Sequence, residues 1–149
     1  MEPPKKYEVA LTAKMQPTYQ ANKPIIVEYT FTNTTKKTLY VLDWHSPLEG
    51  IKNKIFKAER DGQTLEYQGP MVKRGNPVKD NYKEIKPGQS ITAKVDLAKA
   101  YDITKAGKYR FEYNGKLMDH SYDGKAIPKV SDKLTPYQTA GSAIHFTIK

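Results

Sequence analysis

The sequence has no cysteine and a single tryptophan among its 149 residues. The lack of cysteine excludes disulfide bonds, thiolate zinc sites, a cysteine nucleophile and a cysteine-to-metal inhibitory switch. No apolar run approaches the about 20 residues that a membrane-spanning helix needs, so we expect no membrane partner. Leucine, isoleucine, valine and phenylalanine number only 29, but 11 tyrosines add large side chains that a core can bury. We therefore expect a folded domain with a tyrosine-rich core.

Catalytic and cofactor motifs are missing as well. None of the three histidines is followed by glutamate, which excludes a His-Glu-x-x-His zinc helix. Neither a Gly-x-Ser-x-Gly elbow nor a phosphate-binding Gly-Lys-Ser/Thr loop is present. His120 lies near Asp119 and Asp123, where a solvated loop is favoured over a weak metal site. We expect no enzyme activity, no catalytic residue, no bound metal and no cofactor.

Basic residues are in excess, with 25 Lys and Arg against 16 Asp and Glu, for a net charge of +9. The lysines are spread over the chain rather than gathered in one stripe. Basic and stacking aromatic side chains are not interleaved in one strand pair, as an RNA-binding platform would require. We therefore expect a solvated, lysine-rich surface and no nucleic-acid partner.

Apolar side chains recur at every second position in five segments, which predicts half-buried β-strands. These segments are Tyr7–Ala13, Ile25–Asn33, Ile91–Leu97, Lys108–Tyr113 and Ala143–Lys149. Asp61-Gly62 predicts a type I′ hairpin that joins Ile55–Arg60 to Gln63–Tyr67. About seven to eight short strands at this spacing predict an all-β fold, an antiparallel immunoglobulin-like β-sandwich with long loops. We expect one domain over residues 1–149.

Tyr109 is placed for a tyrosine corner. It lies early in a predicted strand and follows a corner at Asp102–Gly107. In immunoglobulin-like sandwiches, a tyrosine at this place returns its hydroxyl group to the backbone of the corner. The order of strand, corner and Gly-x-Tyr favours this arrangement over an ordinary core tyrosine. Just before the corner, Leu97–Tyr101 is expected to form one helical turn.

Three segments lack the period of a strand. Asp43–Gly50 holds the only tryptophan together with His45 and Pro47. Gly69–Pro77 begins with Gly-Pro and ends with proline, which prevents ladder pairing through most of it. Residues 114–141 form a long connection without clear periodicity. A connection as long as this last one is usually functional or disordered in a compact domain.

Two of these segments carry ordered motifs. Trp44–Gly50 is similar to a Trp-x-x-Pro-Leu-Glu-Gly motif, and Tyr67–Arg74 to a Tyr-x-Gly-Pro-Met-x-Lys-Arg motif. Further segments of the resemblance follow these two motifs along the chain: Tyr82, Ile85–Ser90, Val95–Asp102 and Gly107–Tyr109. Over about residues 40 to 113, this order resembles the N-terminal propeptide domain of bacterial deuterolysin-type zinc endopeptidases, the group that includes peptidyl-Lys metalloendopeptidases.

The resemblance implies a role as a protein inhibitor. Such precursors continue into a zinc catalytic domain with a His-Glu-x-x-His helix, which this sequence does not contain. The chain is thus expected to be the propeptide domain alone or a separately encoded relative that docks on the zinc endopeptidase and covers its cleft. The resemblance also implies a periplasmic or secreted protein whose signal peptide has been removed, because Met1–Lys6 lacks the apolar core of a signal. The sequence alone is equally compatible with a cytosolic protein.

Loop composition and the resemblance together predict a partner-binding site. Trp44, Leu48 and Met71 are candidate apolar anchors. Lys73 and Arg74 offer basic side chains to a lysine-preferring pocket. His45, Asp43 or Glu49 would displace the zinc-bound water of the protease. The predicted partner-binding residues are Trp44, His45, Pro47, Leu48, Glu49, Pro70, Met71, Lys73 and Arg74.

Proline suits both loops, because it fixes φ and so limits how a peptide can settle as a substrate. A rigid loop also lowers the entropic cost of docking. The sequence leaves open which loop enters the cleft, and we expect a monomer when the domain is free. The alternative function is a generic immunoglobulin-like module that binds a protein or a surface polymer. Exposed aromatic side chains on one sheet would favour that alternative.

Overall fold

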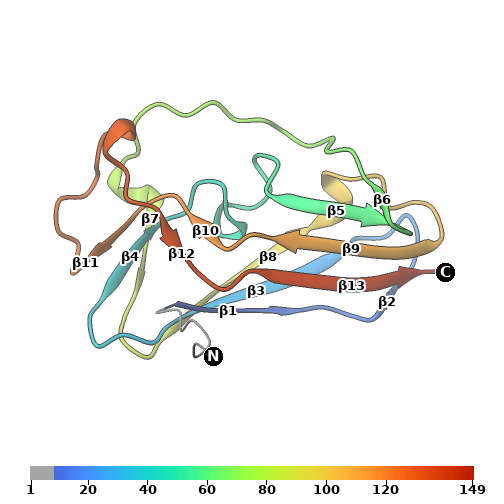
Figure 1. Cartoon of the computed structure of the whole chain (residues 1–149), viewed down its shortest axis with the longest axis horizontal. Helices are drawn as coiled ribbons and strands as arrows, with labels where there is room; N and C mark the ends of the chain where they lie inside the picture. Colours follow the sequence, from blue (N-terminus) through green and yellow to red (C-terminus); the bar gives the residue numbers. More distant parts are fainter. Residues whose placement is uncertain (1–8) are drawn as a thin grey trace, which may run out of the picture.

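The computed structural model describes residues 9–149, which form strands stacked in two facing layers (Figure 1). One layer is a three-stranded sheet of order β1-β3-β8, and the other is a five-stranded sheet of order β2-β13-β9-β5-β6. All pairs in these layers are antiparallel except β2 with β13, which is parallel. Their strands are β1 (Val9–Lys14), β3 (Ile26–Asn33), β8 (Ser90–Asp96), β2 (Thr18–Tyr19), β13 (Ser142–Ile148), β9 (Gly107–Tyr113), β5 (Phe56–Arg60) and β6 (Gln63–Thr64).

Shorter strands and helical turns complete the described part of the chain. A second three-stranded sheet has the order β11-β4-β7, and β10 pairs with β12. These strands are β4 (Leu39–Leu42), β7 (Tyr82–Ile85), β10 (Lys116–Leu117), β11 (His120–Tyr122) and β12 (Tyr137–Gln138). The 3₁₀ turns are η1 (Pro47–Glu49), η2 (Lys79–Asn81), η3 (Leu97–Lys99) and η4 (Ser131–Lys133). No helix in residues 9–149 has the length and apolarity to cross a bilayer.

The predicted all-β class is confirmed, and each of the five period-two segments contains a strand. The part of the first prediction at Tyr7 and Glu8 lies outside the described residues. Asp61 and Gly62 have φ values of 50° and 81°, which are the left-handed values of a type I′ turn. The hairpin is shorter than predicted, because β6 ends at Thr64. The described chain contains more strands than the expected seven to eight, and several of them are only two or three residues long.

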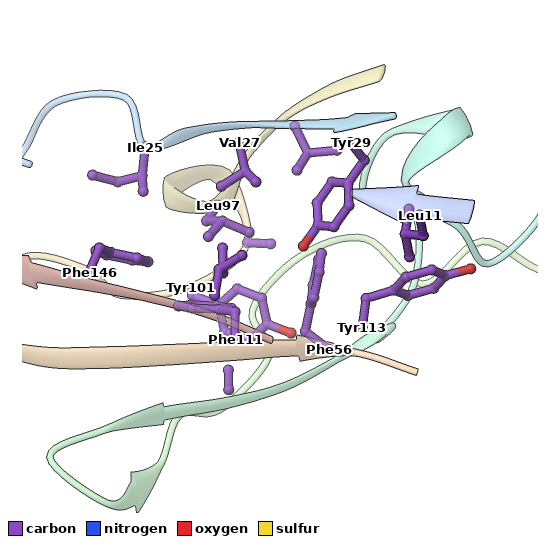
Figure 2. Packing of buried hydrophobic residues seen from close by; sticks show 14 of the residues in the cluster. Leu11, Ile25, Val27, Tyr29, Phe56, Leu97, Tyr101, Phe111, Tyr113 and Phe146 are labelled. Carbon is purple, nitrogen blue, oxygen red and sulfur yellow. The ribbon is translucent and has the colours of Figure 1, made fainter. Parts of the chain in front are cut away.

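The core lies between the two layers and is built from the apolar positions of the alternating strands. In Figure 2, Val27 and Tyr29 of β3 face Phe111 and Tyr113 of β9 across the sandwich. The rings of Phe111 and Phe146 stack with their centroids 5.8 Å apart. Burial of such a side chain stabilises the fold by about 1.5–3 kcal/mol, so a tyrosine-rich core compensates for the shortage of aliphatic residues.

The tyrosine corner is present. The hydroxyl group of Tyr109 donates to the carbonyl oxygen of Lys105 at 2.6 Å, which ties the start of β9 to the preceding corner. The expected helical turn is also found, as η3, with the N–H of Tyr101 donating to the carbonyl of Leu97 at 3.1 Å. In contrast, the buried hydroxyl groups of Tyr29 and Tyr101 have no hydrogen-bond partner among the described residues.

The connection over residues 114–141 is ordered around Asp119, although its sequence has no strand period. The Asp119 side chain accepts hydrogen bonds from the Tyr82 hydroxyl at 2.6 Å, from Lys129 Nζ at 2.7 Å and from the Thr135 N–H at 2.8 Å. Burial opposes ionisation of Asp119, but these hydrogen bonds outweigh it and lower the pKa of its carboxyl group. The carboxylate therefore joins the connection to β7 through Tyr82, and the backbone carbonyl of Asp119 accepts from the Leu42 N–H of β4 at 3.0 Å. His120 forms a hydrogen bond with the Thr135 carbonyl through Nδ1.

Candidate functional site

The first predicted loop, Asp43–Gly50, is fixed by the local chemistry of η1. Ser46 is the N-cap, and its Oγ accepts from the Leu48 N–H at 3.2 Å and donates to the Asp43 carbonyl at 2.8 Å. Pro47 occupies the first turn, where its missing N–H costs nothing. Gly50 ends the turn at a φ of 80°, a left-handed value that glycine adopts without strain. The sequence Ser-Pro-Leu-Glu-Gly thus encodes a rigid single turn.

Trp44 is a buried part of this loop. Its side chain is 5% exposed and forms a small apolar cluster with Leu42 and Tyr82, at the edge of the main core. The indole Nε1 is buried without a hydrogen-bond partner in the described structure. Trp44 therefore packs inside this cluster beside β4 and β7, although the sequence predicted it as an apolar anchor for a partner.

The second predicted loop, Gly69–Pro77, crosses the molecule as an extended segment that we call the arch. In Figure 1 it runs along the upper edge of the view, from β6 towards β7. Its middle is tied to the body at Val72, whose N–H donates to the Lys52 carbonyl at 3.1 Å and whose carbonyl accepts from Asn53 Nδ2 at 3.4 Å. Its far end is tied by Ser131, whose N–H donates to Asn76 Oδ1 at 2.8 Å. The arch is thus held at several points along its length.

Arg74 joins the two predicted loops. Its guanidinium is ion-paired and hydrogen-bonded with Glu49 Oε1 and lies over the ring of Trp44, 5.2 Å from the centroid. The other carboxylate oxygen of Glu49 accepts from the N–H of His45 at 2.7 Å. The side chains of Glu49 and Arg74 are 7% and 21% exposed, so water screens this contact only weakly.

Two carboxylates beneath the arch have shifted pKa values. Burial is the largest influence on Glu49 and raises the pKa of its carboxyl group, against the opposing effects of the His45 N–H and Arg74. Burial likewise raises the pKa of Asp43, although Lys83 Nζ lies 3.4 Å from its Oδ2 and lowers it. Both carboxylates are therefore engaged by basic groups of this chain.

The predicted site residues differ widely in exposure. Met71 is 75% exposed, and Pro70 and Lys73 beside it are exposed as well. Trp44 and Pro47 are buried, and Glu49 and Arg74 are occupied by each other. Leu48 and His45 are half-buried. The structure therefore brings both loops together, with the middle of the arch outermost.

Sequence reasoning missed the residues that hold the arch. Lys52 and Asn53 lie in a stretch without any recognised motif, yet they bond both backbone groups of Val72. Val72 is itself 38% exposed and belongs to the outer surface of the arch. Residues 9–149 contain no group of three or more His, Asp or Glu side chains placed to hold a metal ion.

Comparison with known proteins relates this chain to part of a protease. The chain is 36% identical over 101 residues to an extracellular protease of Aeromonas hydrophila. The match covers 67% of this chain but only 28% of the protease, so the chain corresponds to a minor portion of that protein. No known protein-family profile matches the chain.

Proposed function

We propose that this domain is a non-enzymatic inhibitor, of the propeptide type, that docks on a deuterolysin-like zinc metalloendopeptidase and blocks its active-site cleft. The protease would be an extracellular one, which places the domain in the periplasm or outside the cell. The observation that carries the proposal is the arch, which exposes Met71 and Lys73 while Val72 and Arg74 bind the body of the domain. The similarity to a portion of an extracellular protease supports it.

An inhibitory loop has to fill a cleft without being consumed as a substrate. The arch suits this task because its ties at Val72, Arg74 and Asn76 limit its movement towards an attack geometry. They also reduce the entropy that docking would otherwise cost. A cut chain would remain attached on both sides of the break, so the two new ends would stay close together.

The two basic residues of the arch then have separate roles. Lys73 is exposed and supplies the basic side chain for a lysine-preferring pocket, with Met71 as the apolar anchor beside it. Arg74 is ion-paired with Glu49 and stacked on Trp44, and these contacts hold the arch against the body of the domain. Pro47, Leu48 and Glu49 belong to that support, through η1. In this arrangement, no residue of the domain needs to reach the zinc ion of the protease.

The alternative of a generic binding module finds less support. Its expected signature is a set of exposed aromatic side chains on one sheet. The exposed large apolar residues in the described chain are all aliphatic: Ile26, Met71, Val72, Val78 and Val130.

The test is a titration of the domain against a mature deuterolysin-type zinc endopeptidase, following cleavage of a small lysine-containing peptide. We expect stoichiometric loss of activity, with the 149-residue chain intact afterwards. Lys73→Met is expected to weaken inhibition at least about tenfold, because a basic group in a pocket of opposite charge is worth more than 1.4 kcal/mol. Lys36→Met is the matched control, since Lys36 is exposed in a distant turn. Digestion of the domain without inhibition would overturn the proposal.

A further inference from the structure

A pocket of about 210 Å³ lies beside the first loop, and the charged side chains in its lining are all basic. It is lined by His45, Lys54, Ile55, Asn114, Lys116 and Met118. Two of these side chains are cationic, His45 adds an imidazole, and none of them is a carboxylate. In the described chain, no hydrogen bond or ion pair engages the imidazole of His45 or the ammonium groups of Lys54 and Lys116. The pocket therefore brings together several side-chain groups that are available to bind a ligand.

The backbone holds two of these donors in place. His45 has a φ of 54°, a left-handed value that costs a non-glycine residue about 1–2 kcal/mol. The hydrogen bond from its N–H to Glu49 Oε2 stabilises this backbone conformation, in which His45 lines the pocket. The Lys116 N–H donates to Asn114 Oδ1 at 2.9 Å, which leaves the Asn114 amide nitrogen as a donor without a partner in residues 9–149. Strained backbone that is held in this way is typical of ligand clamps.

The remaining lining narrows the class of ligand. Ile55 and Met118 supply an apolar wall, which an inorganic oxyanion would not use. A carboxylate on a short aliphatic stem would place its oxygens against the lysines, the imidazole and the amide, with its methylene groups on that wall. Glu49, the acidic group bonded to the His45 backbone, is already neutralised by Arg74 and does not compete.

We propose that the pocket between His45, Lys54 and Lys116 binds an aliphatic carboxylate, and that its occupant is an acidic side chain of the docked protein. The identity of that protein as a protease rests on the proposed function, whereas the carboxylate site does not. Lys54 directly follows Asn53, which holds the centre of the arch. The pocket is also joined to the arch through Glu49, which bonds the His45 N–H and pairs with Arg74, so a partner that covers Met71 and Lys73 lies beside it.

The first test uses propionate as the probe and needs no protease. Sodium propionate is titrated into ¹⁵N-labelled protein at constant ionic strength, with sodium chloride and sodium phosphate in parallel. We expect saturable shifts of the backbone amides of His45, Lys54, Asn114 and Lys116 with propionate. Lys54→Gln/Lys116→Gln is expected to weaken binding at least about tenfold, because two charge contacts are lost. The double control Lys36→Gln/Lys133→Gln, at exposed positions, removes the same charge and is expected to bind as the wild type does.

Three outcomes overturn the carboxylate assignment: no saturable shift, an equal response to phosphate or chloride, or equal weakening in the control. The second test measures inhibition of the protease by the same two variants. A loss of about tenfold in the pocket variant alone supports the partner carboxylate, and equal inhibition by both variants overturns it. If the wild type does not inhibit, the proposed function fails while the propionate result still decides the site.

Discussion

Arg74 is ion-paired with the buried carboxylate of Glu49, 25 positions earlier in the chain. Its neighbour Lys73 forms no ion pair within the described part of the chain and remains exposed. Two adjacent basic residues are thus separated into one that stabilises the loop and one that is available to a partner. The pair gives a direct way to separate stability from binding by mutation.

Arg74→Met is expected to destabilise the domain by about 1–3 kcal/mol, because it leaves Glu49 buried without its basic partner. Lys73→Met is expected to change the free energy of unfolding by less than about 0.5 kcal/mol, as is usual for an exposed side chain without contacts. Urea unfolding of both variants measures the difference. Equal stabilities would show that the Arg74 contact does not hold the arch.

Trp44 is expected to report on the arch by fluorescence, because it is the only tryptophan and lies under Arg74. In the native protein its emission should be blue-shifted and weakly quenched by acrylamide, as befits an indole that is 5% exposed. Arg74→Met should increase quenching under native conditions, and Lys73→Met should not. Strong quenching already present in the wild type would contradict the buried position.

Acid stability should depend on Asp119. Its pKa is lowered in the folded state, so its contribution is complete above the ordinary value of 3.8 and is lost as the pH falls through the folded value. Asp119→Asn is expected to cost about 3 kcal/mol at neutral pH, because Lys129 loses its buried partner. It should also flatten the decline in stability below pH 3.8. Asp132→Asn, in the exposed turn η4, is the control and should retain the wild-type acid profile.

The tyrosine hydroxyl groups offer a matched pair of substitutions. Tyr109→Phe is expected to lower stability by about 1 kcal/mol, since the hydrogen bond to the Lys105 carbonyl is lost and that carbonyl is left partly unsatisfied. Tyr101→Phe removes a buried hydroxyl that has no partner in residues 9–149 and should be neutral or stabilising. Chemical unfolding of the two variants compares them. A larger loss for Tyr101→Phe would indicate that its hydroxyl is satisfied in solution.

The parts of the fold that the sequence predicted depend on local chemistry. Period-two alternation identifies β3, β9 and β13, because one face of each strand is buried and the other is wet. Asp61-Gly62 identifies the hairpin, because its type I′ turn needs residues that accept a positive φ. Tyr109 identifies the corner, because the corner needs a tyrosine hydroxyl group at this position. These signals need only a few consecutive residues.

The parts that escaped prediction depend on contacts between distant positions. β10, β11 and β12 have two or three residues each, which is too few for alternation to appear. β10 pairs with β12 and β11 with β4, and Asp119 adds side-chain bonds to Lys129 and Tyr82. In the candidate site, the sequence indicated both loops but not that Arg74 would join them. It also gave no indication that Lys54 and Lys116 line one pocket with His45.

The parallel pairing of β2 with β13 has a consequence for the order of folding. Thr18 and Tyr19 have their ladder partners at Thr147 and Ile148, close to the opposite end of the sequence. β9, which forms the middle of the same sheet, also needs β13 for one of its edges. During synthesis, β2 therefore has no partner in this sheet until residues 147 and 148 have been made, and the five-stranded sheet stays incomplete until then. Such non-local pairing predicts folding on the scale of milliseconds to seconds, with late closure as its slowest step.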